Sequence, residues 1–364
     1  MADERGPDEG ASGLDDGTPN EDERAGTEPG SGGPTTQGAG GRGVVGHVVS
    51  VFWNRRERRL RLPWRFAVAA VLVGLLVLVV GSVAVVALGD AWIDGAGGQV
   101  LSFVGMVVGL PAASYLVGRR RIDGLGLGLD RQWARDLGFG LALGMVLPTL
   151  LFLVGVAAGW VTITGVVGTT PDAFLVFGDW PVSLSLLAVV LFFVGVAVSE
   201  ELFVRGYLLT NLAEALGGFD RIGPRLAIGL ATVSTAGLFG LLHAENPNAT
   251  ALSIANITLF GVLLGLGYVW TDRLGVPIGL HLAWNTVVGA VYGFPVSGLT
   301  IGVTVFETET SGPALLTGGA FGPEGGLLVL LALVVGTGLT AWWVRRAYGD
   351  LALRESVAVP TLRE

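Results

Sequence analysis

Residues 182–205 read VSLSLLAVVLFFVGVAVSEELFVR, an apolar run that ends in two adjacent glutamates followed by an arginine. Such a run predicts a membrane-spanning helix, which needs about 20 residues. Charged side chains inside a membrane cost at least about 2.5–3.5 kcal/mol each. Glu200, Glu201 and Arg205 are therefore expected to have a function or a specific partner there.

The composition of the whole chain agrees with a membrane protein. Of its 364 residues, 51% are hydrophobic and only 14% are charged, which is typical of a polytopic membrane protein and not of a disordered chain. The chain has no cysteine, which excludes disulfides, thiolate metal sites and cysteine nucleophiles. All 22 basic residues are arginine, so chemistry that needs a lysine is excluded as well.

Apolar stretches recur along the chain and predict an all-α, polytopic membrane protein with about eight transmembrane helices. Arginines occupy every second connection between these stretches, and the other connections contain none. Because basic residues accumulate on the cytoplasmic side, the pattern predicts a multi-pass protein of the cell membrane with both termini in the cytoplasm. The predicted spans cover residues 66–88, 98–117, 137–159, 183–206, 226–244, 251–271, 276–294 and 325–344.

The chain is predicted to have four segments. Residues 1–46 are expected to be a disordered acidic tail, because they carry too little apolar surface to offset the loss of chain entropy. Residues 47–65 mix aromatic and aliphatic groups with arginines, which is typical of a basic amphipathic juxtamembrane segment. The eight-span membrane domain covers 66–346, and residues 347–364 form a short cytoplasmic tail.

The charged residues of the fourth span are expected to differ in their surroundings. Glu201 and Arg205 share one face of a helix and can pair. Glu200 is rotated by about 100° from Glu201 and can point into another environment, poised to accept a proton. The alternative is a cluster at the cytoplasmic end of the helix whose charges extend into water.

Two histidines lie in later apolar stretches. His243 follows Phe239 by one helical turn, so that the phenyl ring can pack against the imidazole or orient it. His281 and Asn285 are four residues apart and would share one face of the seventh span. Taken singly, each is more often a helix–helix hydrogen bond than part of a site.

Taken together, these residues favour a single site, because polar groups in lipid must face one another or a water-filled cavity. A carboxylate can deprotonate water, and imidazole and amide groups can stabilise an oxyanion, as peptide hydrolysis requires. Glu200, His243 and His281 also match the ligands of a divalent metal such as zinc. The candidate catalytic residues are Glu200, Glu201, Arg205, His243, His281 and Asn285.

Three motifs carry a family resemblance. In this order and on separate spans, Glu200-Glu201-x-x-x-Arg205-Gly206, Phe239-x-x-x-His243 and His281-x-x-x-Asn285 resemble the motifs of the CPBP intramembrane proteases. This family includes the CAAX prenyl endopeptidases and the bacteriocin self-immunity proteins, also called Abi. The resemblance covers about residues 183–294. Val204 stands where the family often has an aromatic residue, a change expected to affect packing.

The resemblance implies a glutamate-dependent hydrolase, and the family has been described both as a metalloprotease and as metal-free. It implies that Glu200 is the base that activates water and that the pair of Glu201 and Arg205 supports it. His243 would be a second catalytic or metal-coordinating group.

The remaining implied roles concern the substrate. His281 and Asn285 would bind the oxyanion or the water. The implied substrate is a membrane protein or a lipidated, CAAX-like prenylated peptide within the lipid bilayer. No nucleic-acid partner is expected, and the sequence indicates no oligomeric state.

Two other functions fit the same residues: a non-enzymatic scaffold or immunity protein, and a proton-coupled transporter. No internal repeat supports a transporter. The depth of His243 conflicts with a simple arrangement, because about 18 residues of helix would place it roughly 27 Å from the cytoplasmic side, where Glu200 and His281 are expected. For His243 to reach the same site as Glu200 and His281, the fifth span must begin at a different height, be tilted or be re-entrant.

Overall fold

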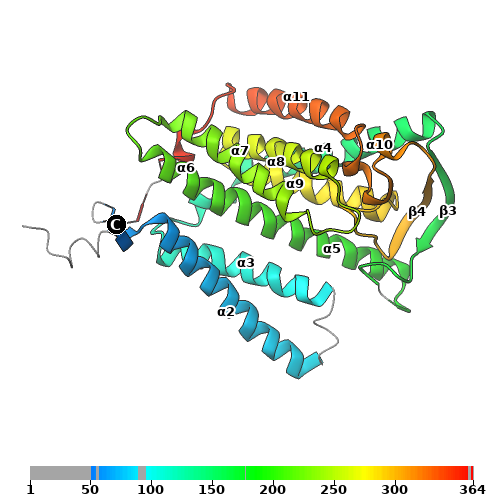
Figure 1. Ribbon diagram of the computed structural model, residues 1–364, viewed down its shortest axis with the longest axis horizontal. Coiled ribbons are helices and arrows are strands. Elements are labelled where there is room, and N and C mark those ends of the chain that lie inside the picture. The colour runs from blue at the N-terminus through cyan, green and yellow to red at the C-terminus, as the bar shows by residue number, and fades with distance from the viewer. Residues whose placement is uncertain (1–50, 55–56, 89–95, 177, 360–361, 364) are drawn as a thin grey trace, which may run out of the picture. The chain divides into compact units, whose positions relative to one another are not determined.

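The computed structural model describes residues 51–54, 57–88, 96–176, 178–359 and 362–363 (Figure 1). They belong to one compact unit, Val48–Glu364. The acidic tail predicted for residues 1–46 lies outside the described residues. The described part is a helical bundle with two short antiparallel strand pairs, which confirms the predicted class of an all-α polytopic membrane protein.

Eight apolar helices form the body of the molecule. In the described part of the chain, seven are long and apolar enough to cross a membrane, and the helix over Gly275–Val291 is shorter than the predicted span 276–294. They are α2 (Leu62–Leu88), α3 (Ala96–Leu116), α4 (Arg131–Ala157), α5 (Val182–Glu201), α7 (Pro224–Leu242), α8 (Ala251–Thr271), α9 (Gly275–Asn285) and α11 (Val329–Tyr348).

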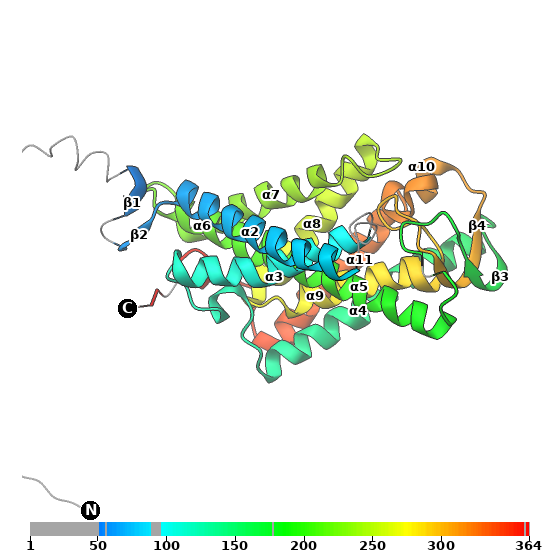
Figure 2. The ribbon, with the colours of Figure 1, turned by 90° about the horizontal axis from the view of Figure 1, so that it is seen from below.

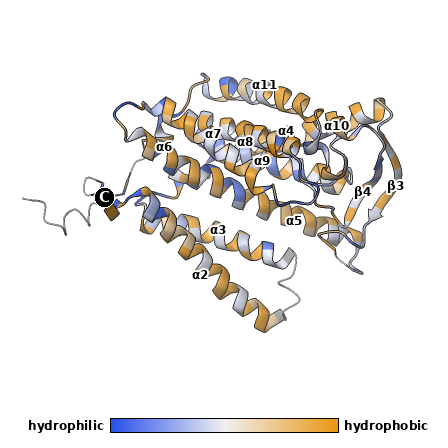
Figure 3. Cartoon of the chain, viewed as in Figure 1, coloured by the Kyte–Doolittle hydropathy of each residue, from blue (hydrophilic) through white to orange (hydrophobic). Residues whose placement is uncertain are grey.

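The helix α9 packs against α4, α5 and α8, and α11 packs against α4 and α8. The pair α2 and α3 covers one side of α5, and α7 and α8 form a second antiparallel pair (Figures 1 and 2). α2 is hydrophobic along almost its whole length (Figure 3), yet only 11% of its most apolar window is buried inside the protein. Such an exposed apolar helix needs a lipid environment.

The helix that carries the two glutamates is longer than predicted. α5 continues without a break into a π-helical segment, η3 (Leu202–Leu209), and then into α6 (Thr210–Gly217). Together they form one helix of 36 residues, whereas the predicted span ended at residue 206. Polar residues lower the hydropathy of this last part, but their side chains are largely buried by partners, so the helix does not stop.

This length removes the conflict over the depth of His243. Glu201 lies sixteen residues before the end of α6, and His243 lies nineteen residues after the start of α7, the next helix. At 1.5 Å per residue, both are roughly 24–29 Å from the same end of the bundle. Glu200 and Glu201 therefore lie in the middle of a continuous helix, at about the same distance from this end as His243. The end of the bundle where α6 stops and α7 starts extends beyond the connection between α8 and α9. The fifth span therefore begins at a different height, which is one of the three expected solutions.

The helix α9 is held in place by close contact with α4. A Cβ atom added to Gly140 would lie 2.4 Å from the carbonyl oxygen of Val276. One added to Gly279 would lie 2.4 Å from the carbonyl oxygen of Leu137. Only glycine permits this approach of two backbones, which fixes the helix that carries His281.

Two connections far apart in the sequence pair with each other. β3 (Val161–Thr169) and β4 (Val303–Thr310) form an antiparallel ribbon at the end of the bundle opposite α6 (Figure 1). Both connections lack arginine and were expected on the same side of the membrane. The ribbon brings the turns that follow it over the interior of the bundle.

The described part of the predicted juxtamembrane segment folds back onto the bundle. β1 (Trp53–Asn54) and β2 (Arg59–Leu60) form a short hairpin before α2 begins. Arg59 and Arg65 are buried and bind Glu214 of α6. These two arginines are therefore used inside the protein and not on a membrane surface.

Candidate active site

Glu201 and Arg205 form the buried ion pair that their spacing predicts. Arg205 Nη1 lies 2.9 Å from Glu201 Oε1, and neither side chain is more than 1% exposed. Arg205 Nη2 donates to the carbonyl oxygen of Gly261 on α8 over 3.0 Å. The guanidinium also lies 4.6 Å from the ring centre of Phe239 on α7. The pair thus ties α5 to α7 and α8, and its charges do not extend into water.

The same glutamate orients His281. His281 Nδ1 lies 2.8 Å from Glu201 Oε1. A carboxylate paired with Arg205 can only accept, so Nδ1–H is the donor. The other ring nitrogen, Nε2, then faces Glu200, whose Oε2 is 3.9 Å away. Arg205, Glu201 and His281 form a hydrogen-bonded chain that fixes the orientation of the imidazole ring through its Nδ1 side.

Glu200 differs from its neighbour, as the rotation along the helix predicts. Its side chain is 25% exposed and lines a cavity, whereas Glu201 is fully buried. Oε2 of Glu200 is buried and has no hydrogen-bond donor among the described residues. The distance of 3.9 Å to His281 Nε2 is too long for a hydrogen bond and leaves room for a bridging molecule.

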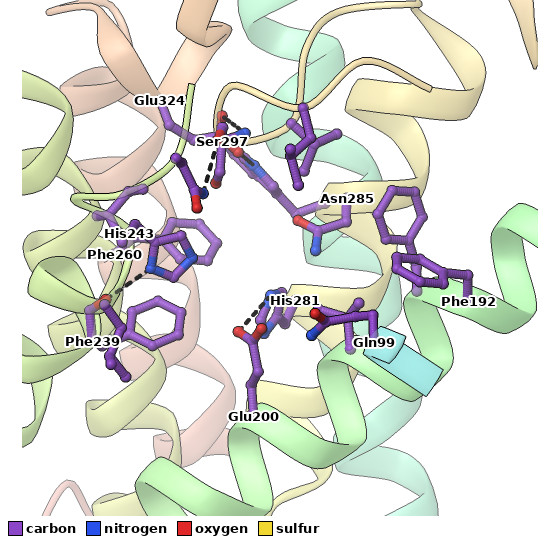
Figure 4. A pocket seen from close by; sticks show the side chains of 18 of the residues that line it. Gln99, Phe192, Glu200, Phe239, His243, Phe260, His281, Asn285, Ser297 and Glu324 are labelled. Carbon is purple, nitrogen blue, oxygen red and sulfur yellow. Dashed lines mark hydrogen bonds and ion pairs between the residues drawn. The ribbon is translucent and has the colours of Figure 1, made fainter. Parts of the chain in front are cut away.

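His243 faces the same cavity from the opposite wall (Figure 4). Its Nδ1 lies 2.8 Å from the carbonyl oxygen of Phe239, which can only accept, so Nδ1 carries a proton and, in the neutral ring, Nε2 is the acceptor. The rings of Phe239 and His243 are 4.8 Å apart, edge to face. Phe239 therefore orients the imidazole, as its position one turn earlier predicts.

The cavity has a volume of about 430 Å³ and collects four of the six predicted residues. Glu201 and Arg205 lie behind its wall. The remaining lining is mainly aromatic and aliphatic. The four residues that line it are Glu200, His243, His281 and Asn285 (Figure 4).

Two of the three motif helices change their winding, one within its motif and one just after it. The π-helical segment η3 begins directly after Glu201, and η4 (Thr286–Val291) begins directly after Asn285. π-Helical turns are rare and occur frequently at functional sites, because they alter the direction of side chains along a helix. No local sequence signal predicted either segment.

Four polar residues that line the cavity were not predicted. Gln99 comes from α3, Asn246 from the loop after α7, and Ser297 and Glu324 from the connection between α9 and α11. The signal that could have found Glu324 is an acidic side chain in an otherwise glycine-rich connection. The others resemble ordinary loop or helix residues in the sequence.

The three candidate metal ligands do not form a metal site in this arrangement. In the part of the chain that the structure describes, no three side chains of His, Asp or Glu gather closely enough to hold a metal ion. A catalytic zinc needs three protein ligands at about 2.0–2.2 Å. Glu200, His243 and His281 share the cavity, but they do not fit such a shell.

The cavity brings the carboxylate of Glu200 together with histidine and amide groups inside a multi-pass membrane protein. Residues 182–287 match the model of a family described as type II CAAX prenyl endopeptidase Rce1-like. The matched segment contains all three motifs and confirms the resemblance to the CPBP proteases. At the level of the family, it indicates a CAAX-type intramembrane protease. Comparisons of the chain with curated proteins and with solved structures give no match.

Proposed function

We propose that this protein is an intramembrane endopeptidase in which Glu200 activates water to hydrolyse a peptide bond of a membrane-associated protein. One observation carries the proposal: the buried Oε2 of Glu200, which lacks a protein donor, faces a cavity that His243, His281 and Asn285 also line. A general base needs a free acceptor within reach of its proton donor, and Glu200 offers one.

The first step uses the space between Glu200 and His281. When the imidazole of His281 is neutral and its proton lies on Nδ1 toward Glu201, a water molecule that gives one proton to Glu200 Oε2 can donate a hydrogen bond to Nε2 with its other O–H. The 3.9 Å between the two atoms suits such a bridge. As Glu200 takes the proton, the water oxygen bonds to the carbonyl carbon of the scissile peptide.

The second step breaks the peptide bond. The carbonyl oxygen becomes an oxyanion, and the side-chain amide of Asn285 can donate a hydrogen bond to it. The carbon–nitrogen bond then breaks, and Glu200 returns its proton to the departing amine. The free Nε2 of His243 can accept a hydrogen bond from the peptide N–H across the cavity.

The lining of the cavity supports an apolar, membrane-associated substrate. Its walls include Met106, Phe192, Phe203 and Phe260, and no arginine lines it among the described residues. We propose a prenylated CAAX-type protein as the substrate, by similarity to the printed name of the matched family. The arginine pattern supports an orientation in the cell membrane with both termini in the cytoplasm.

The test is cleavage of a farnesylated fluorogenic CAAX peptide by the purified protein in liposomes. Glu200→Gln should lower kcat by about 10²–10⁴-fold, the usual contribution of a general base. Glu309→Gln is the matched control, because Glu309 is exposed on the ribbon strand β4. Full activity of Glu200→Gln would refute the proposed base. A folded wild type that cleaves no prenylated or membrane peptide would favour a scaffold.

Chelation addresses the metal question in the same preparation. Since the described carboxylates and imidazoles do not form a zinc shell, EDTA or phenanthroline should change the rate less than about twofold. Complete loss of activity that zinc restores would show that the three candidate ligands rearrange around a metal.

A further inference from the structure

The cavity contains a second carboxylate from a segment outside the family match. Glu324 lies in the short turn η6 (Pro323–Gly325) and faces the cavity across from Glu200 (Figure 4). It is buried, and both of its oxygens accept hydrogen bonds. Oε1 accepts from Trp284 Nε1 over 2.8 Å, and Oε2 accepts from the backbone N–H of Ser297 over 3.1 Å.

The turn that contains Ser297 needs this support. Val296 and Leu299 pair through their backbone groups, and the two residues between them have positive φ angles of 48° at Ser297 and 86° at Gly298. Two consecutive positive φ angles define a tight hairpin turn that favours Asn and Gly. Serine at the first position is strained, and such a residue persists only where its surroundings hold it.

A second hydrogen bond holds the turn from its other side. The carbonyl oxygen of Ser297 accepts from Asn246 Nδ2 over 2.9 Å. Asn246 belongs to the loop that follows His243. On the opposite side, the indole that binds Glu324 belongs to Trp284, the residue before Asn285, and it is buried against Phe260 with ring centres 5.0 Å apart.

A continuous chain of hydrogen bonds therefore crosses the side of the cavity that lies across from Glu200. It runs from Trp284 through Glu324 and the backbone of Ser297 to Asn246. One end adjoins the helix of Asn285, and the other adjoins the loop of His243. We propose that Glu324 is a positioning residue for the reaction, which holds these two walls at the separation that lets Asn285 and His243 face Glu200.

This inference rests on the proposed function, and its chemistry explains why the residue is a glutamate. Only a carboxylate offers two acceptor oxygens, one for each N–H. A glutamine would keep the shape but place an NH₂ group against one of the two donors. The buried donor would then lose its partner, and one wall would be free to shift.

Kinetics of conservative variants test the role. Glu324→Gln should lower kcat roughly 10- to 100-fold with KM within about threefold, because displacement of catalytic groups by about 1 Å has effects of this size. Glu324→Asp, which keeps two acceptors, should recover part of the rate. The matched control Glu309→Gln should behave as wild type. A kcat for Glu324→Gln within twofold of wild type, per folded protein, would overturn the proposal.

A double-mutant cycle tests the link to Trp284. Trp284→Phe removes the indole N–H, so in that background Glu324→Gln should lower kcat by a clearly smaller factor than in wild type. Equal factors in the two backgrounds would show that the carboxylate does not act through the indole and would overturn the connection to α9.

A distance measurement tests the positioning without any activity. Because the chain has no cysteine, spin labels can be attached selectively at Glu245→Cys and Thr300→Cys, two exposed positions beside the linked loops. Double electron–electron resonance should give a narrow distribution of distances between the two spin labels, and Glu324→Gln should broaden it. An unchanged distribution with an unchanged kcat refutes the role of Glu324 alone. Absence of any cleavage by wild type refutes the proposed function instead.

Discussion

Two clusters of buried charge lie on the same long helix, and only one of them leaves an acceptor free toward a cavity. In the first cluster, Glu201 binds Arg205 and His281 through Oε1, and among the described residues Oε2 of Glu200 and Oε2 of Glu201 have no donor. The second cluster surrounds Glu214, about three turns further along in α6.

At Glu214 both oxygens are used by arginines. Oε1 accepts from Arg59 and from Arg65, the latter over 3.0 Å. Oε2 accepts from Arg59 over 3.2 Å and from Arg120 over 2.7 Å. These contacts join the N-terminal hairpin and the α3–α4 connection to α6, and Glu214 does not line the described cavity.

The comparison shows that a buried charge is not by itself a sign of catalysis. Both clusters contain arginine–glutamate pairs with almost no exposure. What distinguishes the first cluster is that Glu200 has an oxygen without a donor that faces a cavity. This carboxylate lies next to His281, whose orientation is fixed by Glu201. Substitutions in the two clusters should therefore separate activity from stability.

The largest effect is expected for Glu201→Leu, which should lower both the activity and the unfolding free energy. The substitution leaves Arg205 buried without a counter-ion, which costs about 3–5 kcal/mol of unfolding free energy. It also removes the acceptor that orients His281, so kcat of the remaining folded protein should fall by about 10²–10⁴-fold. Thermal unfolding in detergent and cleavage kinetics measure the two effects. Retention of wild-type kcat would contradict the orienting role.

The next largest effect is expected for Glu214→Gln, and it should affect stability alone. Three arginines would lose their shared carboxylate, with a cost of about 3–5 kcal/mol in unfolding free energy. The kcat of the folded fraction should stay within about twofold of wild type, since Glu214 has no contact with the cavity residues. A selective loss of kcat would mean that this cluster takes part in the reaction.

The same helix shows what could and could not be predicted from the sequence. The ion pair of Glu201 and Arg205 and the different environment of Glu200 follow from helical spacing, and the structure has both. The extension of the helix to Gly217 could not be predicted, because hydropathy counts Glu214 as a polar residue in lipid. Its three arginine partners come from distant segments that only the folded chain brings together.

The cavity shows the same limit. The four residues that line it were predicted because they are polar groups in apolar spans, and such groups must face one another or a water-filled cavity. Glu324 could not be predicted, since it reaches the site through a turn more than thirty residues after the last motif, held by a backbone N–H and an indole.

A smaller effect is expected for Asn285→Ala, which tests the oxyanion role. Removal of one oxyanion donor costs about 10²–10³-fold in kcat, and KM should change little. Asn211→Ala is the matched control, because Asn211 is also a buried amide but donates to the carbonyl oxygen of Tyr207 on its own helix. If both variants lost the same kcat, the effect of Asn285→Ala would be structural.

The smallest effect concerns a third kind of buried carboxylate, one with neutral partners. Glu324 accepts from an indole and a backbone N–H, and no arginine of the described residues pairs with it; burial raises its pKa above the ordinary value. Between the ordinary and the raised pKa, the folded state binds more protons than the unfolded state, so the unfolding free energy falls as the pH rises through this window.

Glu324→Gln removes this titration. The thermal midpoint of wild type minus that of Glu324→Gln should therefore decrease as the pH rises from about 4 upward, starting near the ordinary glutamate pKa. Glu214→Gln should not show this decrease, because arginines offset the burial of that carboxylate. A difference that is constant or grows with pH would mean that the hydrogen bonds from Trp284 and Ser297 outweigh the desolvation of Glu324, and that its environment resembles that of Glu214 after all.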